Sequence, residues 1–293
     1  MQEVTVIIPT QALAARSAVI QRAIDSVLVQ QGVRAVPLLS INGTRGDPEL
    51  LARLRADRRL TLVEQENAGI PGAFELARAT VTTPFLSALD DDDLLLPGAL
   101  SARVQLLREH PECDSVITNG FRRAGTRDQL HVADSTAVNR DPLAELLLGN
   151  WLLPGSWLCR SEAADAAFFA AMPRFRECTY LAVRFGMSGR MIFLDLPTVV
   201  WHTGTPGTES GSRQYRVGGV EATNRLLELP LPAKFREGLR RKLSAACHVV
   251  AEIHLLEGAI GEAWKWHFRS LRYPGGLRHV FYTRRLLAAT VRS

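Results

Sequence analysis

Four consecutive aspartates, Asp90 to Asp93, directly follow the apolar segment Phe-Leu-Ser-Ala-Leu at residues 85–89. A short continuous apolar run of this kind is typical of a strand that is buried on both faces of a parallel sheet. Carboxylates packed side by side repel and raise one another's pKa unless positive charge neutralises them. A chain with this run at the end of a buried strand must place a cation there or leave the run in solvent.

Hard carboxylate oxygens favour Mg²⁺ or Mn²⁺, and proteins commonly hold such ions together with the phosphate oxygens of a substrate. The run therefore predicts a site for Mn²⁺ or Mg²⁺ and a substrate that carries a diphosphate. The alternative is an exposed acidic turn that caps a helix beginning near residues 94–97, because aspartate also stabilises a helix N-terminus.

Strand and helix patterns alternate along the first 93 residues. Apolar and β-branched runs that predict strands occupy 4–9, 36–41, 60–63 and 85–89. Apolar residues at helical spacing lie between them, in 18–31, 50–54 and 73–79. This alternation predicts an α/β fold with a mostly parallel, Rossmann-like sheet flanked by helices. Ligands of such sheets bind beyond the carboxyl ends of the strands, where this chain has its polar residues.

The second half of the chain has a more mixed pattern. Further strands are predicted at 115–118, 155–159, 191–194 and 199–201. Beyond about residue 218 the apolar residues recur at helical intervals, which predicts a helical C-terminal region.

Four groups of residues carry a resemblance to a known family. They are Val6 to Thr10, Asn42-Gly43-Thr44 with Asp47, Asn67-x-Gly69 with Ala73, and Leu89 to Asp93 with Pro97 and Leu100. Together they resemble glycosyltransferase family 2, the inverting enzymes of the GT-A fold. The resemblance implies that a sugar is transferred from a nucleoside-diphosphate sugar, with a UDP-sugar favoured, to a hydroxyl of a carbohydrate or lipid-linked acceptor. It also implies a GT-A catalytic domain over residues 1–215, with a nucleotide-sugar-binding half at 1–93 and an acceptor-side half at 94–215, followed by a helical region at 216–293.

The resemblance and the chemistry of the side chains give a set of expected site residues. The residues expected to bind the donor nucleotide are Pro9, Thr10, Asn42, Asn67, Asp90 and Asp91. The residues expected to bind the metal are Asp92, Asp93 and His202. In the family, the Asp-x-Asp element that maps onto Asp90 and Asp92 binds the ribose and the metal, and a neutral imidazole can complete such a site.

A second, weaker stretch of resemblance runs from Trp151 to His202. Family members often carry Glu-Asp before a helix, and Glu177-Cys178 stands in that place. Attack on an anomeric carbon needs a base that takes the proton of the acceptor hydroxyl, and a carboxylate can do this. Glu177 is the predicted catalytic base, and Asp195 is a possible substitute because the usual aspartate is Cys178.

Two further positions depart from the family pattern. The acid that commonly reads the base after the second strand is replaced by Asn42 or displaced to Asp47, and the arginine that often follows Asn-x-Gly is Phe74. Asn42 can still hydrogen-bond a uracil edge, because its amide offers both a donor and an acceptor. The loop at 203–212 is rich in Gly, Thr and Ser, and we expect it to be mobile and to close over the diphosphate.

The net charge of +5 arises mainly at the C-terminal end, from about residue 234 onward. Basic residues interleaved with aromatics there fit an interfacial helix on anionic lipid, or a helical appendage that packs its aromatics on the catalytic domain, which we prefer. No recognised motif for nucleic acid accompanies the charge, so no nucleic-acid partner is expected. The sequence leaves a monomer and a homo-oligomer open.

The chain has neither a signal-peptide pattern nor an apolar stretch of the roughly 18 residues that span a bilayer. Its four cysteines are widely separated, which favours reduced thiols. We therefore expect a cytoplasmic protein, with peripheral contact to the inner face of the membrane left open.

Two rival functions remain. A nucleotidyltransferase would carry a glycine-rich, basic phosphate loop after the first strand, and residues 9–12, Pro-Thr-Gln-Ala, lack that character. A degenerate, non-catalytic nucleotide-sugar-binding module would retain the fold without the base, which Cys178 and Phe74 allow.

Overall fold

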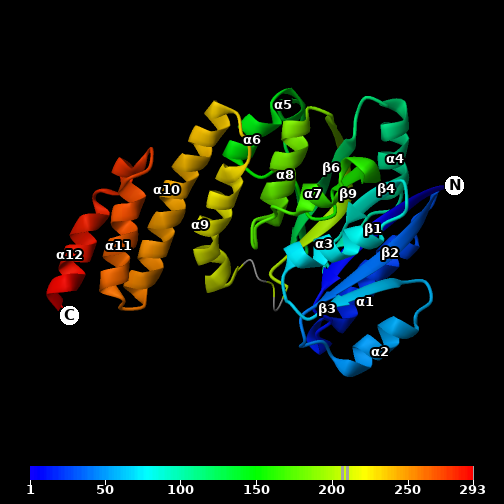
Figure 1. The fold of residues 1–293 in the computed structure, drawn as a ribbon, viewed down its shortest axis with the longest axis horizontal. Helices are drawn as coiled ribbons and strands as arrows, with labels where there is room; N and C mark the ends of the chain where they lie inside the picture. Colours follow the sequence, from blue (N-terminus) through cyan, green and yellow to red (C-terminus); the bar gives the residue numbers. More distant parts are fainter. Residues whose placement is uncertain (206–207, 209–210, 293) are drawn as a thin grey trace. The chain divides into compact units, whose positions relative to one another are not determined.

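The computed structural model describes residues 1–205, 208 and 211–292 (Figure 1). A mixed β-sheet is formed by strands that lie between residues 2 and 203. Within these residues its strands lie in the order β3, β2, β1, β4, β8, β6, β9 and β5, and β7 pairs with β6. The strands are β1 (Gln2–Thr10), β2 (Val33–Asn42), β3 (Thr61–Gln65), β4 (Phe85–Ala88), β5 (Leu94–Leu95), β6 (Ser115–Ala124), β7 (Arg127–Leu130), β8 (Trp157–Arg160) and β9 (Met191–Thr203).

The N-terminal half of the sheet is parallel, as the alternating pattern predicts. β1 runs parallel to β2 and β4, and β2 runs parallel to β3. Beyond β4 the sheet becomes mixed, because β8 is antiparallel to both of its neighbours and β5 is antiparallel to β9. The expected α/β class with a mostly parallel sheet and flanking helices is confirmed.

β9 is one continuous strand, whereas the sequence predicts two strands separated at residues 195–198. Pro197 interrupts the apolar pattern and removes a backbone donor, which makes the segment read as a break. The pairing with β6 absorbs the irregularity through register shifts around Asn119. Such a bulge lets a strand continue past a residue that cannot join the ladder.

Helices cover both faces of the sheet. α1 (Ser17–Leu28), α2 (Pro48–Ala56) and α4 (Ala99–Glu109) contribute to one apolar core with alternate residues of β1. On the other face lie α3 (Ile70–Thr80), α7 (Ala166–Phe169) and α8 (Glu177–Ser188), where Phe74 stacks on Phe169 and Trp157 contacts Phe185. The shorter helices are η1 (Ala14–Arg16), α5 (Ser135–Arg140), α6 (Pro142–Leu148) and η2 (Ser161–Ala163).

An acidic side chain begins several of these helices. Asp47 accepts a hydrogen bond from the Leu50 amide at 2.8 Å and so caps α2. Asp134, Asp141 and Asp165 do the same for α5, α6 and α7. Because a cap satisfies an amide that the helix itself cannot pair, Asp47 has a structural role after the second strand.

Arg103 of α4 is a fully buried guanidinium that connects strands of the mixed half. It donates hydrogen bonds to Thr198 Oγ1 at 2.5 Å, to the Trp157 carbonyl at 3.2 Å and to Thr118 Oγ1 at 3.2 Å. Burial lowers the pKa of Arg103 to about 9, so the group still carries its charge at neutral pH. A single side chain thereby ties α4 to β6, β8 and β9.

The chain divides into two units, Met1–Met172 with Glu177–Pro206, and Pro173–Arg176 with Gly207–Ser293. The second unit consists mainly of α9 (Arg213–Glu228), α10 (Ala233–Leu256), α11 (Ile260–Leu271), η4 (Gly276–His279) and α12 (Tyr282–Arg292). Its core contains Val220, Leu243, Cys247 and Val250. Among the described residues, every helix is too short or too polar to cross a membrane.

The buried guanidinium predicts a large loss of stability on truncation. Arg103→Ala should lower the free energy of unfolding by about 3–5 kcal/mol, because it leaves a cavity and unpaired buried oxygens. Arg103→Met, which fills most of the volume, should cost less. Urea unfolding followed by circular dichroism measures the stability of both variants. The control is Arg34→Ala, at an exposed arginine, which should change the free energy of unfolding by roughly 0.5 kcal/mol or less. A loss of unfolding free energy below about 1 kcal/mol for Arg103→Ala would contradict the structural role given to this guanidinium.

Candidate active site

The aspartate run lies in the turn between β4 and β5. Asp91, Asp92 and Asp93 are buried, with 7%, 8% and 0% of their surface exposed, and Asp90 is half-buried. β5 follows at once and pairs with Val199 and Val200 of β9. The alternative of an exposed acidic turn is therefore wrong, and the carboxylates need partners inside the protein.

Asp91 finds its partners within the chain. The Thr10 hydroxyl donates to Asp91 Oδ2 at 2.5 Å, and the Arg16 guanidinium contacts both carboxylate oxygens. The Ala12 amide donates to Thr10 Oγ1 at 3.0 Å and fixes that hydroxyl. Burial raises the pKa of Asp91, and the hydrogen bonds from Arg16 and Thr10 oppose this rise. Thr10 and Asp91, both expected to bind the donor, thus also hold each other in place.

Asp92 also lies close to the Arg16 guanidinium. Arg16 Nη2 lies 3.3 Å from Asp92 Oδ2, and Arg22 Nη2 donates to the Asp92 main-chain carbonyl at 2.6 Å. Because Arg22 binds the carbonyl, it fixes the turn without occupying the side-chain carboxylate. The Asp92 carboxylate is therefore only partly paired.

Asp93 and His202 meet where the turn approaches the end of β9. The His202 amide donates to Asp93 Oδ1 at 2.7 Å, and His202 Nδ1 lies 3.7 Å from the same oxygen. Asp93 Oδ2 and His202 Nδ1 are buried and have no hydrogen-bond partner among the described residues. Leaving a buried carboxylate oxygen unpaired is costly, so its position favours a bound cation.

Three carboxylates converge in a way that suits a divalent ion. Asp90, Asp92 and Asp93 each offer an oxygen, and these atoms lie within 4.8 Å of one another. Burial and the neighbouring carboxylates raise the pKa of Asp90 well above its usual value, and burial does the same for Asp93. Hard oxygen ligands of this number fit Mg²⁺ or Mn²⁺ that keeps open positions for phosphate. His202 is not part of this converging group, although burial lowers its pKa and so favours the neutral, metal-binding form.

Glu177 opens α8 close enough to the cluster to influence it. Its charge is among the causes that raise the pKa of Asp90, and burial together with Asp90 and Glu177 raises the pKa of the Cys178 thiol well above its usual value. Cys178 therefore stays protonated and is a poor base. Phe175 and Arg176, just before the helix, have φ values of +65° and +64°. Two successive left-handed residues without glycine store strain of the kind found at functional sites.

The other expected donor contacts differ in their surroundings. Asn42 is buried, donates to the Thr10 carbonyl at 3.1 Å and accepts from the Gly69 amide at 3.0 Å. It therefore joins the ends of β1 and β2 to the Asn-x-Gly loop, using both halves of its amide. Pro9 lies in β1 beside Ser40 of β2, and Asn67 is exposed after β3.

Sequence reasoning missed Arg16 and Arg22, which supply the internal positive charge. Arg16 occupies the N-cap position of α1, where a cation is unfavourable because the helix dipole is positive at that end. A basic residue in that place without a capping side chain signals an acidic partner from elsewhere in the fold. That signal was present in the sequence, but its partner lies 75 residues away in the chain.

Two further expectations concern β9 and the segment after it. Asp195, the substitute base, is exposed and accepts a hydrogen bond from Asn119 Nδ2 at 2.8 Å. It precedes His202 along β9 by a distance of roughly 20 Å, given the rise per residue of a strand, so the structure does not bring it to the cluster. The loop expected to close over the diphosphate, 203–212, lies partly outside the described residues.

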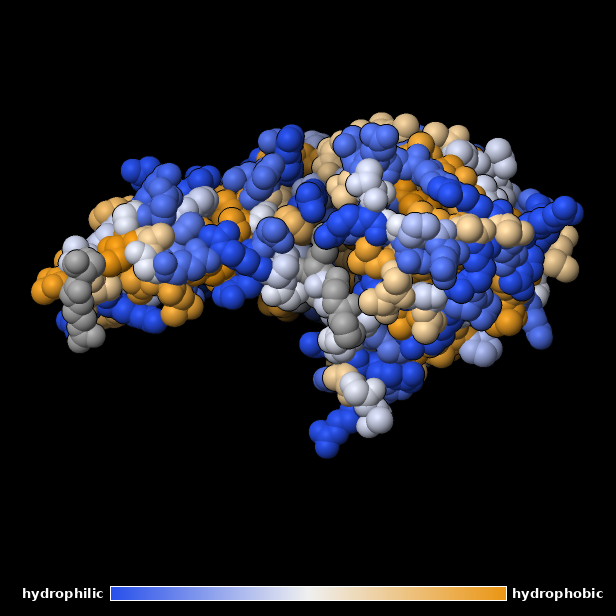
Figure 2. Space-filling model, turned by 90° about the horizontal axis from the view of Figure 1, so that it is seen from below, coloured by the Kyte–Doolittle hydropathy of each residue, from blue (hydrophilic) through white to orange (hydrophobic). Residues whose placement is uncertain are grey.

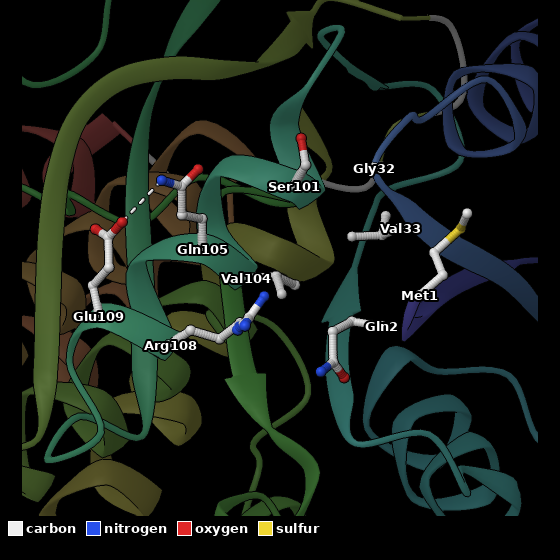
Figure 3. A pocket seen from close by; sticks show the side chains of 9 residues that line it. All are labelled: Met1, Gln2, Gly32, Val33, Ser101, Val104, Gln105, Arg108 and Glu109. Atoms are coloured by element: carbon white, nitrogen blue, oxygen red, sulfur yellow. Dashed lines mark hydrogen bonds between the residues drawn. The ribbon is translucent and has the colours of Figure 1, made fainter.

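A surface hollow of about 670 Å³ lies elsewhere on the first unit (Figure 3). Its lining includes Met1 and Gln2 at the start of β1, Val33 at the start of β2, and Arg108 and Glu109 of α4. These are the amino ends of parallel strands, whereas ligands of such sheets bind at the carboxyl ends. We therefore place the active site at the aspartates.

Comparisons with known proteins identify the family of the chain. The model of the family described as glycosyl transferase family 2 matches residues 5–161, more than half of the chain. This range contains most of β1, the aspartate run and β8. No curated protein sequence matches the chain significantly.

Solved structures share the fold at low sequence identity. The crystal structure of S. aureus TarS 1–349 in complex with UDP-GlcNAc matches with a TM-score of 0.58 and 14% identity, covering 85% of this chain and 72% of that chain. TarS 1–349 in complex with UDP matches with a TM-score of 0.52 and 12% identity, covering 85% and 71%. With the family match over the catalytic half, these findings show that the chain belongs to glycosyltransferase family 2 and is a glycosyltransferase of the GT-A fold.

Proposed function

We propose that the protein transfers a sugar from a nucleoside-diphosphate sugar, a UDP-sugar in the first instance, to an acceptor hydroxyl with inversion at the anomeric carbon, with the help of Mn²⁺ or Mg²⁺. The observation that carries this proposal is the convergence of Asp90, Asp92 and Asp93 around a buried, unpaired oxygen of Asp93. A site so acidic does not favour a diphosphate by itself. A divalent ion held by these carboxylates would supply the positive charge that a diphosphate needs.

The ion would be held by Asp92 and Asp93, with Asp90 beside them and His202 as a nearby nitrogen donor. When bound, it would neutralise charge that develops on the departing diphosphate. The other expected donor contacts are Pro9, Thr10, Asn42, Asn67, Asp90 and Asp91. Arg16 and Arg22 hold the turn in shape, so that the carboxylates do not rearrange when the donor arrives.

Glu177 is the proposed catalytic base. Its carboxylate would take the proton from the acceptor hydroxyl as that oxygen attacks the anomeric carbon, while the bond from this carbon to the diphosphate oxygen breaks on the opposite face. A single displacement of this kind inverts the anomeric centre. Cys178 cannot replace Glu177, because its protonated thiol has no place to accept the proton.

The proposed donor and the proposed acceptor rest on different observations. The TarS structures contain UDP-GlcNAc and UDP, which supports a uridine donor, although the likeness at 14% identity concerns the fold. The acceptor is proposed to be a carbohydrate or a lipid-linked hydroxyl, in polysaccharide, glycolipid or glycoside synthesis. We also propose a cytoplasmic protein with no nucleic-acid partner, with catalysis assigned to residues 1–215 and a monomer or a homo-oligomer left open.

Substitution of Asp92 should affect metal binding more than substitution of its neighbour Asp91. Asp92→Asn should weaken Mn²⁺ binding at least tenfold, because it removes one of the converging carboxylates, whereas Asp91→Asn should change it less than about threefold because Asp91 is already paired with Arg16. Electron paramagnetic resonance of free Mn²⁺ measures both, with circular dichroism as the check on folding. Equal effects of the two variants would refute the assignment of the ligands.

Removal of the metal should abolish transfer without unfolding the protein. Excess EDTA should reduce sugar transfer to background while circular dichroism shows that the protein remains folded, because the turn keeps Arg16 and Arg22 as internal partners. Added Mn²⁺ or Mg²⁺ should restore activity. Full transfer in the presence of the chelator would remove the metal from the mechanism.

The base assignment predicts a loss confined to turnover. Glu177→Gln should lower kcat by about 10²–10⁴-fold while the affinity for UDP changes little, because the base acts on the acceptor side. Glu162→Gln, on the exposed part of the same unit, is the matched control and should be neutral. If only donor binding weakens, the base lies elsewhere. If the wild type binds UDP with Mn²⁺ but never turns over, the non-catalytic alternative that Cys178 and Phe74 allow is correct.

A further inference from the structure

The C-terminal helices hold most of the exposed large apolar side chains of the described residues. Seven of twelve such side chains lie between Leu256 and Val291. Single exposed apolar residues are ordinary on protein surfaces, but a concentration of them marks a surface that contacts something apolar. Figure 2 shows orange, apolar atoms beside blue, hydrophilic atoms over this end of the chain.

One face of α12 and the segment just before it carries this pattern. Phe281, Leu287 and Val291 are 73%, 53% and 88% exposed. With Arg284 they recur at intervals of three and four residues, so they share one side of the helix. We call Phe281, Arg284, Arg285, Leu287 and Val291 the outer face of α12.

The opposite side of α12 is fixed to α11, so the outer face does not arise from a detached helix. Leu286 is fully buried. Trp264 Nε1 donates to Thr290 Oγ1 at 3.0 Å, and His267 Nε2 lies 2.9 Å from Thr283 Oγ1. The helix thus uses its inner side for packing and presents its outer face as a rigid surface.

The charge of the last 33 described residues is predominantly positive. Residues 260–292 contain seven basic residues (Lys265, Arg269, Arg272, Arg278, Arg284, Arg285 and Arg292) and one acidic residue, Glu262. Glu262 pairs with Lys265 within α11. The Arg284 guanidinium lies 5.7 Å from the centre of the Phe281 ring, so charge and apolar surface are neighbours.

We propose that the outer face of α12 docks on an anionic lipid bilayer. Phe281, Leu287 and Val291 would enter the region between headgroups and acyl chains, and the arginines would bind the phosphates. A second copy of this chain is disfavoured, because it would bring two strongly basic segments together. Nucleic acid would use the arginines but would leave the exposed aliphatic side chains without a role. This proposal concerns the location of the enzyme and stands independently of the sugar-transfer proposal.

Co-sedimentation of the full chain with vesicles tests the proposal without any donor. Neutral vesicles of phosphatidylcholine are compared with vesicles that also contain phosphatidylglycerol. We expect binding to the anionic vesicles at least tenfold tighter than to the neutral ones, and weaker at high salt, because each basic residue near an anionic surface adds to the affinity.

Two variants divide the apolar and the electrostatic contributions. Phe281→Ser with Leu287→Ser and Val291→Ser should weaken binding to anionic vesicles at least tenfold, and Arg284→Gln with Arg285→Gln about tenfold. The matched control replaces three exposed apolar residues of the first unit, Val29→Ser with Leu130→Ser and Leu148→Ser, and should bind like the wild type. Circular dichroism confirms that each variant is folded.

Four results would overturn the proposal. The wild type could fail to bind anionic vesicles, or the triple serine variant of the outer face could bind as well as the wild type. Analytical ultracentrifugation could instead show a dimer that the same variant dissolves, or RNA could bind more tightly than vesicles. In each case the outer face has another occupant or none, and the activity of the enzyme with a soluble acceptor remains a separate measurement.

Discussion

Negative charge buried at the end of β4 is the constraint on which the catalytic unit depends. Four carboxylates in one turn cannot lose their water unless positive groups replace it. Arg16 approaches from the start of α1, Arg22 binds the main chain from the next turns of the same helix, and the His202 amide arrives from β9. These contacts pair Asp91 and part of Asp92, whereas Asp93 Oδ2 is buried without a hydrogen-bond partner among the described residues, and the proposed cation would bind there.

Much of the fold follows from local sequence patterns, whereas the side-chain contacts that build the site do not. The strands of the parallel half and the position of the aspartates could be predicted, because continuous apolar runs and their polar ends are local features. The contacts of Arg16 with Asp91 and of His202 with Asp93 join residues more than 70 positions apart. No periodicity encodes such pairs. The sequence also did not indicate that β9 is a single strand, because the extra residues of its irregular pairing with β6 lie on either side of Pro197 and interrupt the apolar pattern.

The departures from the family pattern have structural uses in this chain. Phe74 packs on Phe169 and belongs to the apolar layer between α3 and α7, so it leaves the donor side without the usual arginine. Asn42 donates a hydrogen bond to the Thr10 carbonyl and accepts one from the Gly69 amide. Its side chain therefore connects the ends of β1 and β2 to the Asn-x-Gly loop. Cys178 places a neutral thiol beside Glu177, so one carboxylate stands where relatives often have two acidic residues.

The ladder between β5 and β9 also limits how this protein can change in length. Leu94 pairs with Val200 and Leu95 with Val199, and this short ladder directly adjoins the contact between Asp93 and His202. Because side chains alternate along a strand, inserting or deleting one residue here would turn the neighbours of Asp93 to the wrong side of the sheet. The hairpin between β6 and β7, which ends in an exposed turn, has no such restriction. Lineages of this enzyme should therefore vary in size at the hairpin while keeping the spacing around the aspartates constant.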